Sequence, residues 1–140
     1  MANKSAFPIK AAIDDPLART FAFSAQKTMY RGRLIAAGDT VYLFASENEG
    51  GAGLIARGVV TAVEATPRKR GIVRQTPRVS VVVRRTALAQ RRCGRNELKA
   101  FSNWKDGRPE AELNFKFYRQ ATNKIGGISA AAAAFLRGFF

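Results

Sequence analysis

The clearest pattern of apolar and polar positions lies between residues 38 and 64, where short apolar runs alternate with turn residues. The segments 40–45 and 53–63 are rich in β-branched and aromatic residues, and the acidic, glycine-rich connection between them has no helical periodicity. A similar segment, RVSVVVRR, starts at residue 78. The pattern therefore predicts a β-hairpin followed by a third strand over 78–86.

The segments on either side carry weaker patterns. Residues 7–13 are apolar around Pro8, and we expect a strand or an extended arm there. Asp14, Asp15 and Pro16 form a predicted turn, and residues 17–30 are predicted to be broken helix and loop. Farther along the chain, a turn or short helix is expected at 95–101 and a turn at 104–109.

Two periodic segments follow near the C-terminus. Between residues 112 and 118 the side chains of Leu113, Phe115 and Phe117 alternate with polar residues, which predicts a half-buried strand. Ser129 is a suitable N-cap for a terminal helix that Gly138 closes. Short strands at hairpin spacing with peripheral short helices indicate an α+β protein, a small mixed β-barrel that is closed or nearly closed. The 140 residues fit one domain, 1–140.

The order of several short motifs resembles the core of the EVE domain, a PUA-like barrel related to ASCH and YTH domains. These motifs are GD at 38–39, FAS at 44–46, GLIARGVV at 53–60 and VE at 63–64, and the similarity continues through 78–85, 96–99 and 115–135. The resemblance implies a PUA-like fold and a reader of modified bases. The usual EVE opening, a strand with Trp and a K-S-E-P motif, is absent, so no base specificity is transferred from it.

The charge of the chain points to a polyanionic partner. Lys and Arg number 24 against 10 Asp and Glu, and Glu97 is the only acidic residue between 65 and 105. Such a field attracts nucleic acid, either DNA or RNA, although a merely soluble basic surface would have the same composition. The candidate phosphate-binding residues are Lys27, Arg31, Arg68, Lys69, Arg70, Arg74, Arg84 and Arg85.

Aromatic and polar residues could form a base-reading pocket, because bases stack on aromatic rings and their edges accept and donate hydrogen bonds. By resemblance, the pocket lies at one end of the barrel, where a base flipped out of its stack would enter. Strand alternation alone also explains Phe44 as a core residue, and Trp104 could instead be a surface anchor. The candidate pocket residues are Tyr30, Phe44, Ser46, Trp104, Tyr118 and Arg119.

Two other functions fit the sequence. Some ASCH proteins are amidohydrolases that act on acetylated nucleosides, and Lys27, Thr28 and Glu64 stand at comparable places, where an amine, a hydroxyl and a carboxylate could direct water. A basic module could also dock onto RNA or a protein without any pocket. We favour the non-catalytic reader of a modified base.

Several classes of chemistry have little support. Histidine is absent and Cys93 is the single cysteine, so we expect no disulfide, no metal and no cofactor, and Cys93 is interpreted as an ordinary thiol. No run approaches the roughly 18 apolar residues of a membrane span. We therefore expect a cytoplasmic protein with no membrane partner, and the sequence leaves its oligomeric state open.

Overall fold

In the computed structural model, which describes residues 6–67, 70–71 and 77–140, six strands close into a barrel. They are β1 (Ala6–Ala11), β2 (Thr20–Met29), β3 (Thr40–Ala45), β4 (Gly53–Ala65), β5 (Arg78–Leu88) and β6 (Lys124–Gly126). Their order around the barrel is β1, β3, β4, β5, β2, β6. The pairs β1–β3 and β2–β6 are parallel and the others are antiparallel. The predicted small mixed barrel of an α+β protein is confirmed.

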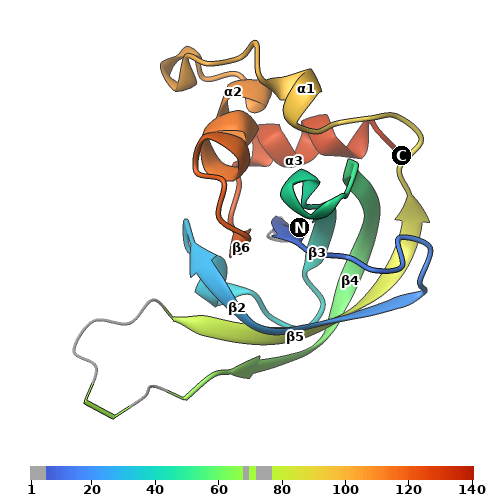
Figure 1. The fold of residues 1–140 in the computed structure, drawn as a ribbon, viewed down its shortest axis with the longest axis vertical. Coiled ribbons are helices and arrows are strands. Elements are labelled where there is room, and N and C mark those ends of the chain that lie inside the picture. The colour runs from blue at the N-terminus through green and yellow to red at the C-terminus, as the bar shows by residue number, and fades with distance from the viewer. Residues whose placement is uncertain (1–5, 68–69, 72–76) are drawn as a thin grey trace.

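Helices gather on one side of the barrel, and the far end of the β4–β5 hairpin points away from them (Figure 1). The α-helices are α1 (Arg95–Leu98), α2 (Pro109–Asn114) and α3 (Ala130–Arg137). Three short 3₁₀ turns, η1 (Gly32–Leu34), η2 (Glu47–Glu49) and η3 (Trp104–Asp106), and the π-helical turn η4 (Phe115–Arg119) complete the described elements.

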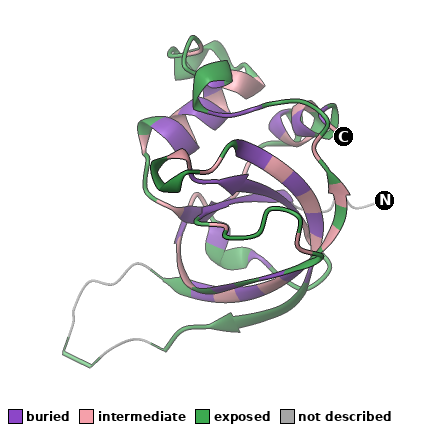
Figure 2. Cartoon of the chain, turned by 45° about the vertical axis from the view of Figure 1, so that its right-hand side comes forward, coloured by how far each residue is buried: buried purple, intermediate pink, exposed green. Residues whose placement is uncertain are grey.

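Alternation along β3 builds two apolar cores. Val41 and Leu43 point into the barrel, whereas Tyr42 and Phe44 pack against the helical layer, and all four are at most 1% exposed. Successive side chains of a strand point to opposite faces, so a strand covered on both faces is apolar throughout. Figure 2 shows buried residues both around the barrel and in the helices that cover it.

Several predicted elements are confirmed. β3 has the predicted bounds, and β4 and β5 extend the predicted strands slightly. The short helix expected at 95–101 is α1, and the turn expected at 104–109 contains η3. Ser129 caps α3, because its hydroxyl oxygen accepts a hydrogen bond of 3.1 Å from the amide of Ala132.

The prediction of broken helix and loop at 17–30 was wrong, because most of this segment is the strand β2. Phe21 and Phe23 are buried and alternate with exposed Ala22 and Ser24, which is the period of a strand. Alanine hides this alternation in the sequence, since an apolar residue occupies an exposed position. A register shift between Phe23 and Gln26 in the β2–β5 pairing interrupts the pattern further.

The strand predicted at 112–118 was also wrong, because this segment belongs to α2 and η4. Leu113 and Phe117 are 0% and 1% exposed and are four residues apart, so they lie on one face of a helix as well as on one face of a strand. Pro109 at the first helical position favours the helix. Packing of this face against the barrel decides between a helix and a strand.

Candidate nucleic-acid interface

The turn after β2 places two candidate residues side by side in an unusual backbone conformation. Tyr30 and Arg31 both have positive φ angles, 52° and 66°. A residue other than glycine pays roughly 1–2 kcal/mol for the left-handed region, so packing must hold this turn. The amide of Gly127 donates a hydrogen bond of 3.0 Å to the Tyr30 carbonyl, and a Cβ atom on Gly127 would come within 2.5 Å of that oxygen.

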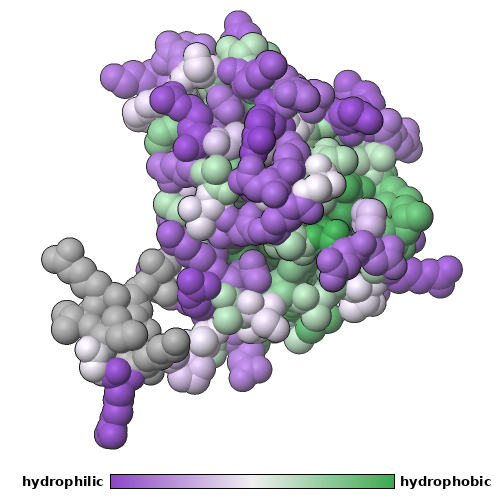
Figure 3. Space-filling model, in the orientation of Figure 1, coloured by the Kyte–Doolittle hydropathy of each residue, from purple (hydrophilic) through white to green (hydrophobic). Residues whose placement is uncertain are grey.

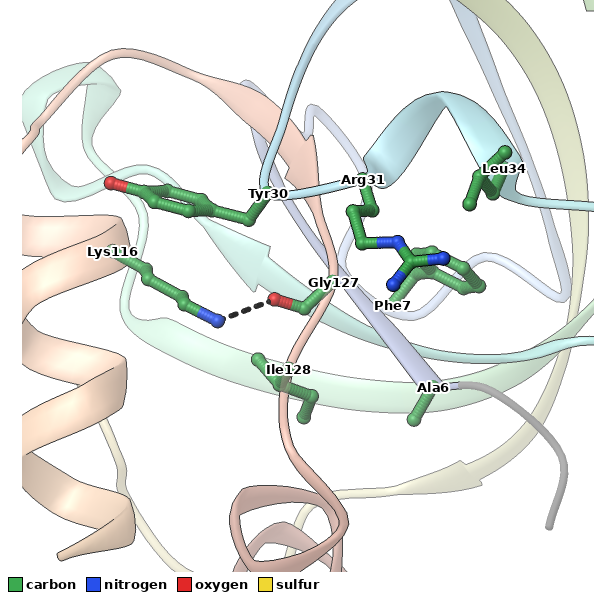
Figure 4. A pocket seen from close by; sticks show the side chains of 8 residues that line it. All are labelled: Ala6, Phe7, Tyr30, Arg31, Leu34, Lys116, Gly127 and Ile128. Atoms are coloured by element: carbon green, nitrogen blue, oxygen red, sulfur yellow. Dashed lines mark hydrogen bonds between the residues drawn. The ribbon is translucent and has the colours of Figure 1, made fainter. Parts of the chain in front are cut away.

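A cavity of about 360 Å³ opens beside this turn (Figure 4). Figure 4 shows Tyr30 and Arg31 pointing in different directions from the same turn, with Lys116 below the Tyr30 ring. The Lys116 ammonium lies 5.0 Å from the centre of that ring, and Arg31 is exposed. The cavity is lined by Ala6, Phe7, Tyr30, Arg31, Leu34, Lys116, Gly127 and Ile128.

A second cavity of about 490 Å³ adjoins the first, because Lys116 lines both. Phe115 lines the second cavity, and its ring centre is 6.5 Å from that of Tyr30 and 5.4 Å from that of Trp104. Trp104 is 53% exposed, so part of its ring is free to contact a ligand. The second cavity is lined by Trp104, Gly107, Arg108, Glu112, Phe115, Lys116 and Ser129.

Hydrogen bonds hold Lys116 between the two cavities. Its ammonium donates to Glu112 Oε2 at 3.0 Å and to the Gly127 carbonyl at 2.9 Å. Burial alone would raise the pKa of Glu112, but hydrogen bonds from Ser129 and Lys116 outweigh burial and lower it. An ammonium has three donors, so one N–H of Lys116 remains for a ligand.

Of the six predicted pocket residues, Tyr30 and Trp104 line these cavities, and the other four do not. Phe44 is buried in the core, where its ring stacks on Phe117 with 6.0 Å between ring centres. Tyr118 contacts Phe44 edge-on and donates to Glu47 Oε1 at 3.1 Å. Burial and the Glu47 carboxylate both raise the pKa of Tyr118.

Ser46 and Arg119 also lie outside both cavities. Ser46 is 1% exposed, and its hydroxyl has no hydrogen-bond partner among the described residues. Arg119 is exposed and donates to the Ser102 carbonyl at 3.0 Å. Sequence reasoning missed Phe115 and Lys116 as site residues, because it assigned them to a strand rather than to η4.

The predicted phosphate-binding residues are spread over the molecule. Arg31 lines the first cavity, and Arg70 is exposed in the connection between β4 and β5. Arg84 is exposed on β5, and Lys27 is half-buried on β2. Arg68, Lys69 and Arg74 lie outside the described residues.

Arg85, a predicted phosphate ligand, instead contacts the backbone closely. Its Nη1 donates to the carbonyls of Leu17 and Ala18 at 2.8 Å and 3.3 Å, so it holds the loop before β2. Hydrophilic side chains cover much of the face drawn in Figure 3, above all over the helical layer. The cations that line the two cavities are Arg31, Lys116 and Arg108.

The three residues of the amidohydrolase alternative do not line one described cavity. The Thr28 hydroxyl donates to the Pro77 carbonyl at 2.7 Å, and Lys27 pairs with Arg78 across the sheet. Glu64 is exposed on β4 and lines a separate cavity of about 210 Å³. This geometry does not favour the hydrolase.

The fold has counterparts among solved structures. Human THYN1 protein in complex with 5-methylcytosine containing DNA matches with a TM-score of 0.67 and 14% identity over 96% of each chain. The DUF55 domain of human thymocyte nuclear protein 1 matches with a TM-score of 0.66 and 14% identity over 96% of this chain and 97% of that one. The chain has the PUA-like barrel fold of these two structures. The fold implied by the sequence resemblance is confirmed.

A hypothetical protein from Leishmania major has a similar fold, with a TM-score of 0.61 and 17% identity over 97% of this chain and 94% of that chain. No protein-family model matches the sequence. No curated protein matches it either. Among the described residues, no helix is long and apolar enough to cross a membrane.

Proposed function

We propose that this protein binds nucleic acid without catalysing a reaction and reads a modified base at the row formed by Tyr30, Phe115 and Trp104. The observation that carries the proposal is that these rings border two adjoining cavities that share Lys116. Aromatic rings stack on any base and gain about 1–3 kcal/mol per base. Cavities of this size are typical of small-molecule sites.

The cations at the cavities support the same proposal. Arg31 at the first cavity and Arg108 at the second are exposed, so both can contact phosphates of a strand whose base is flipped inward. The free N–H of Lys116 can donate to a carbonyl on the base edge. The fold likeness to the human protein bound to 5-methylcytosine containing DNA adds support for a nucleic-acid partner.

Binding of paired oligonucleotides tests the proposal. One DNA oligonucleotide carries a single 5-methylcytosine, and a second one of the same sequence has cytosine at that position. RNA versions of the two form a second matched set. We expect tighter binding of a modified strand, and Tyr30→Ala or Trp104→Ala should weaken that binding by about 5-fold to 150-fold, the equivalent of one lost stacking contact. The loss should be smaller for the unmodified strand.

Arg70→Gln is the matched control, because a phosphate contact carries no sequence information. This variant should weaken modified and unmodified strands alike. Equal affinity for modified and unmodified strands, with equal losses in Tyr30→Ala and Trp104→Ala, would contradict a base reader and leave a general polyanion-binding surface. Circular dichroism of each variant verifies that it is folded.

A further inference from the structure

A third cavity, of about 450 Å³, lies between α3 and strands β3 and β4, and the proposed function does not use it. Its size follows from its small residues, since three alanines stand where larger side chains would fill the space. Two arginines and two hydroxyl groups border the same space. The lining residues are Ala6, Thr40, Tyr42, Arg57, Ala130, Ala133 and Arg137.

The two arginines of this cavity have no carboxylate partner among the described residues, where the only ion pair joins Lys116 and Glu112. Arg57 comes from β4, and its guanidinium lies 5.2 Å from the centre of the Phe140 ring. Arg137 is exposed at the end of α3. Two guanidinium groups at one cavity repel each other, and an anion between them would remove that repulsion.

Tyr42 places a hydroxyl near both charges. Its ring is 1% exposed and packs on Phe140, and its hydroxyl donates to the Ala133 carbonyl over a long 3.5 Å. Such a contact is weak, so the hydroxyl remains able to donate to a ligand. Burial raises the pKa of Tyr42, and the charges of Arg137 and Arg57 oppose that rise. Both cations therefore act on this hydroxyl.

Ala6 connects this cavity to the Tyr30 cavity, because it lines both. The two spaces thus adjoin at the start of β1. A nucleotide strand carries a phosphate next to every base, so a strand with one base in the Tyr30 cavity has phosphates within reach of neighbouring sites. Planar guanidinium groups match phosphate oxygens with paired hydrogen bonds.

We propose that Arg57 and Arg137, with the Tyr42 and Thr40 hydroxyls, bind a backbone phosphate of the nucleic-acid strand. This inference rests on the proposed function, in which a nucleic-acid strand binds at the Tyr30 cavity. It adds a second site, in the cavity that adjoins at Ala6, that holds the same nucleic-acid strand. Neither arginine belongs to the basic segment 65–105 that the sequence singled out. The chemistry required is that of a phosphodiester oxyanion.

The first experiment uses inorganic phosphate as the probe. The side-chain Nε–H signals of arginines in the ¹⁵N-labelled protein are followed while phosphate replaces chloride at constant ionic strength. We expect saturable shifts for Arg57 and Arg137 and none for Arg19, an exposed arginine that does not line the cavity. Equal shifts for all three signals, or no shifts, would overturn the site.

The second experiment uses the modified and unmodified oligonucleotides. Arg137→Gln and the double variant Arg57→Gln with Arg137→Gln should each weaken both strands by about tenfold or more, the scale of a lost charge-assisted contact. The slope of log affinity against log salt should also become shallower by about 1. The control Arg19→Gln should change affinity by less than about twofold, as expected for a charge outside the site.

Arg57 packs on Phe140, so its replacement can disturb the fold, whereas Arg137 is exposed and its single variant keeps the test valid. Unchanged oligonucleotide affinity in Arg137→Gln would overturn the strand assignment, even if inorganic phosphate binds. Loss of affinity in Arg137→Gln without any preference for the modified strand would support the phosphate site and contradict the base reader. The two proposals therefore fail separately.

Discussion

The Nζ atom of Lys10, on β1, donates a hydrogen bond of 2.9 Å to the carbonyl oxygen of Phe117, in η4. It also donates to the Ala121 carbonyl at 3.0 Å, and Lys124 donates to the carbonyls of Lys116 and Gln120. Both lysines are fully buried. The last carbonyls of a helix have no intrahelical partner, so these two ammonium groups join the end of the α2–η4 segment to the barrel.

Lys10→Met should lower the free energy of unfolding by about 3 kcal/mol, because it leaves the buried carbonyl of Phe117 and the part-buried carbonyl of Ala121 without their donor. Urea denaturation measures the change. Lys99→Met, at an exposed position, is the control and should stay within about 0.5 kcal/mol of the wild type. A loss for Lys10→Met no larger than that of the control would show that water satisfies these carbonyls.

Stability should depend on pH through Lys124. Burial, together with the charges of Lys10 and Lys27, lowers the pKa of Lys124 from 10.5 to about 8. Between these two values the unfolded chain binds more protons than the folded one, so this lysine contributes more to stability as pH rises. The loss of unfolding free energy in Lys124→Met should therefore grow from pH 8 toward pH 10.5.

Urea denaturation of the wild type and Lys124→Met at several pH values in that window measures this difference. Subtracting the variant removes the effect of the tyrosines and Cys93, which titrate in both proteins. A difference that stays constant would mean that the helix-end carbonyls keep Lys124 charged in the folded state.

Cys93 should resist thiol reagents in the folded protein. Burial raises the pKa of its thiol from 9.0 to about 12, and the charges of Glu97 and Glu110 add to the rise. Only the thiolate reacts, so its population near pH 8 is about a thousandfold below that of an ordinary thiol. Labelling with a disulfide reagent should be slow in buffer and fast in denaturant. Rapid labelling in buffer would show that this part of the chain opens readily.

The sequence alone determined the strands β3, β4 and β5. Their β-branched and aromatic runs, bounded by turn residues, suit only a strand, and the order of motifs around them indicates the barrel. The charge of +14 also followed from composition. These properties are local, so no distant contact was needed to infer them.

Tertiary structure decided the secondary structure of the segments whose apolar patterns fit both a helix and a strand. Phe21 and Phe23 became strand residues because β5 pairs with β2, and Leu113 and Phe117 became helical because their shared face packs on the barrel. Lys10 and Lys124 are stable when buried only because the carbonyls of a distant helix end accept their hydrogen bonds.

The same reason explains the site. Tyr30 and Trp104 could be chosen by residue type, but the row that they form needs Phe115, and the third cavity needs Arg57 and Arg137 on different elements. Closure of the barrel and packing of the helices bring these residues together across long sequence separations. Local patterns determine which side chains a segment offers, whereas the shared cavities arise only when distant segments pack against each other.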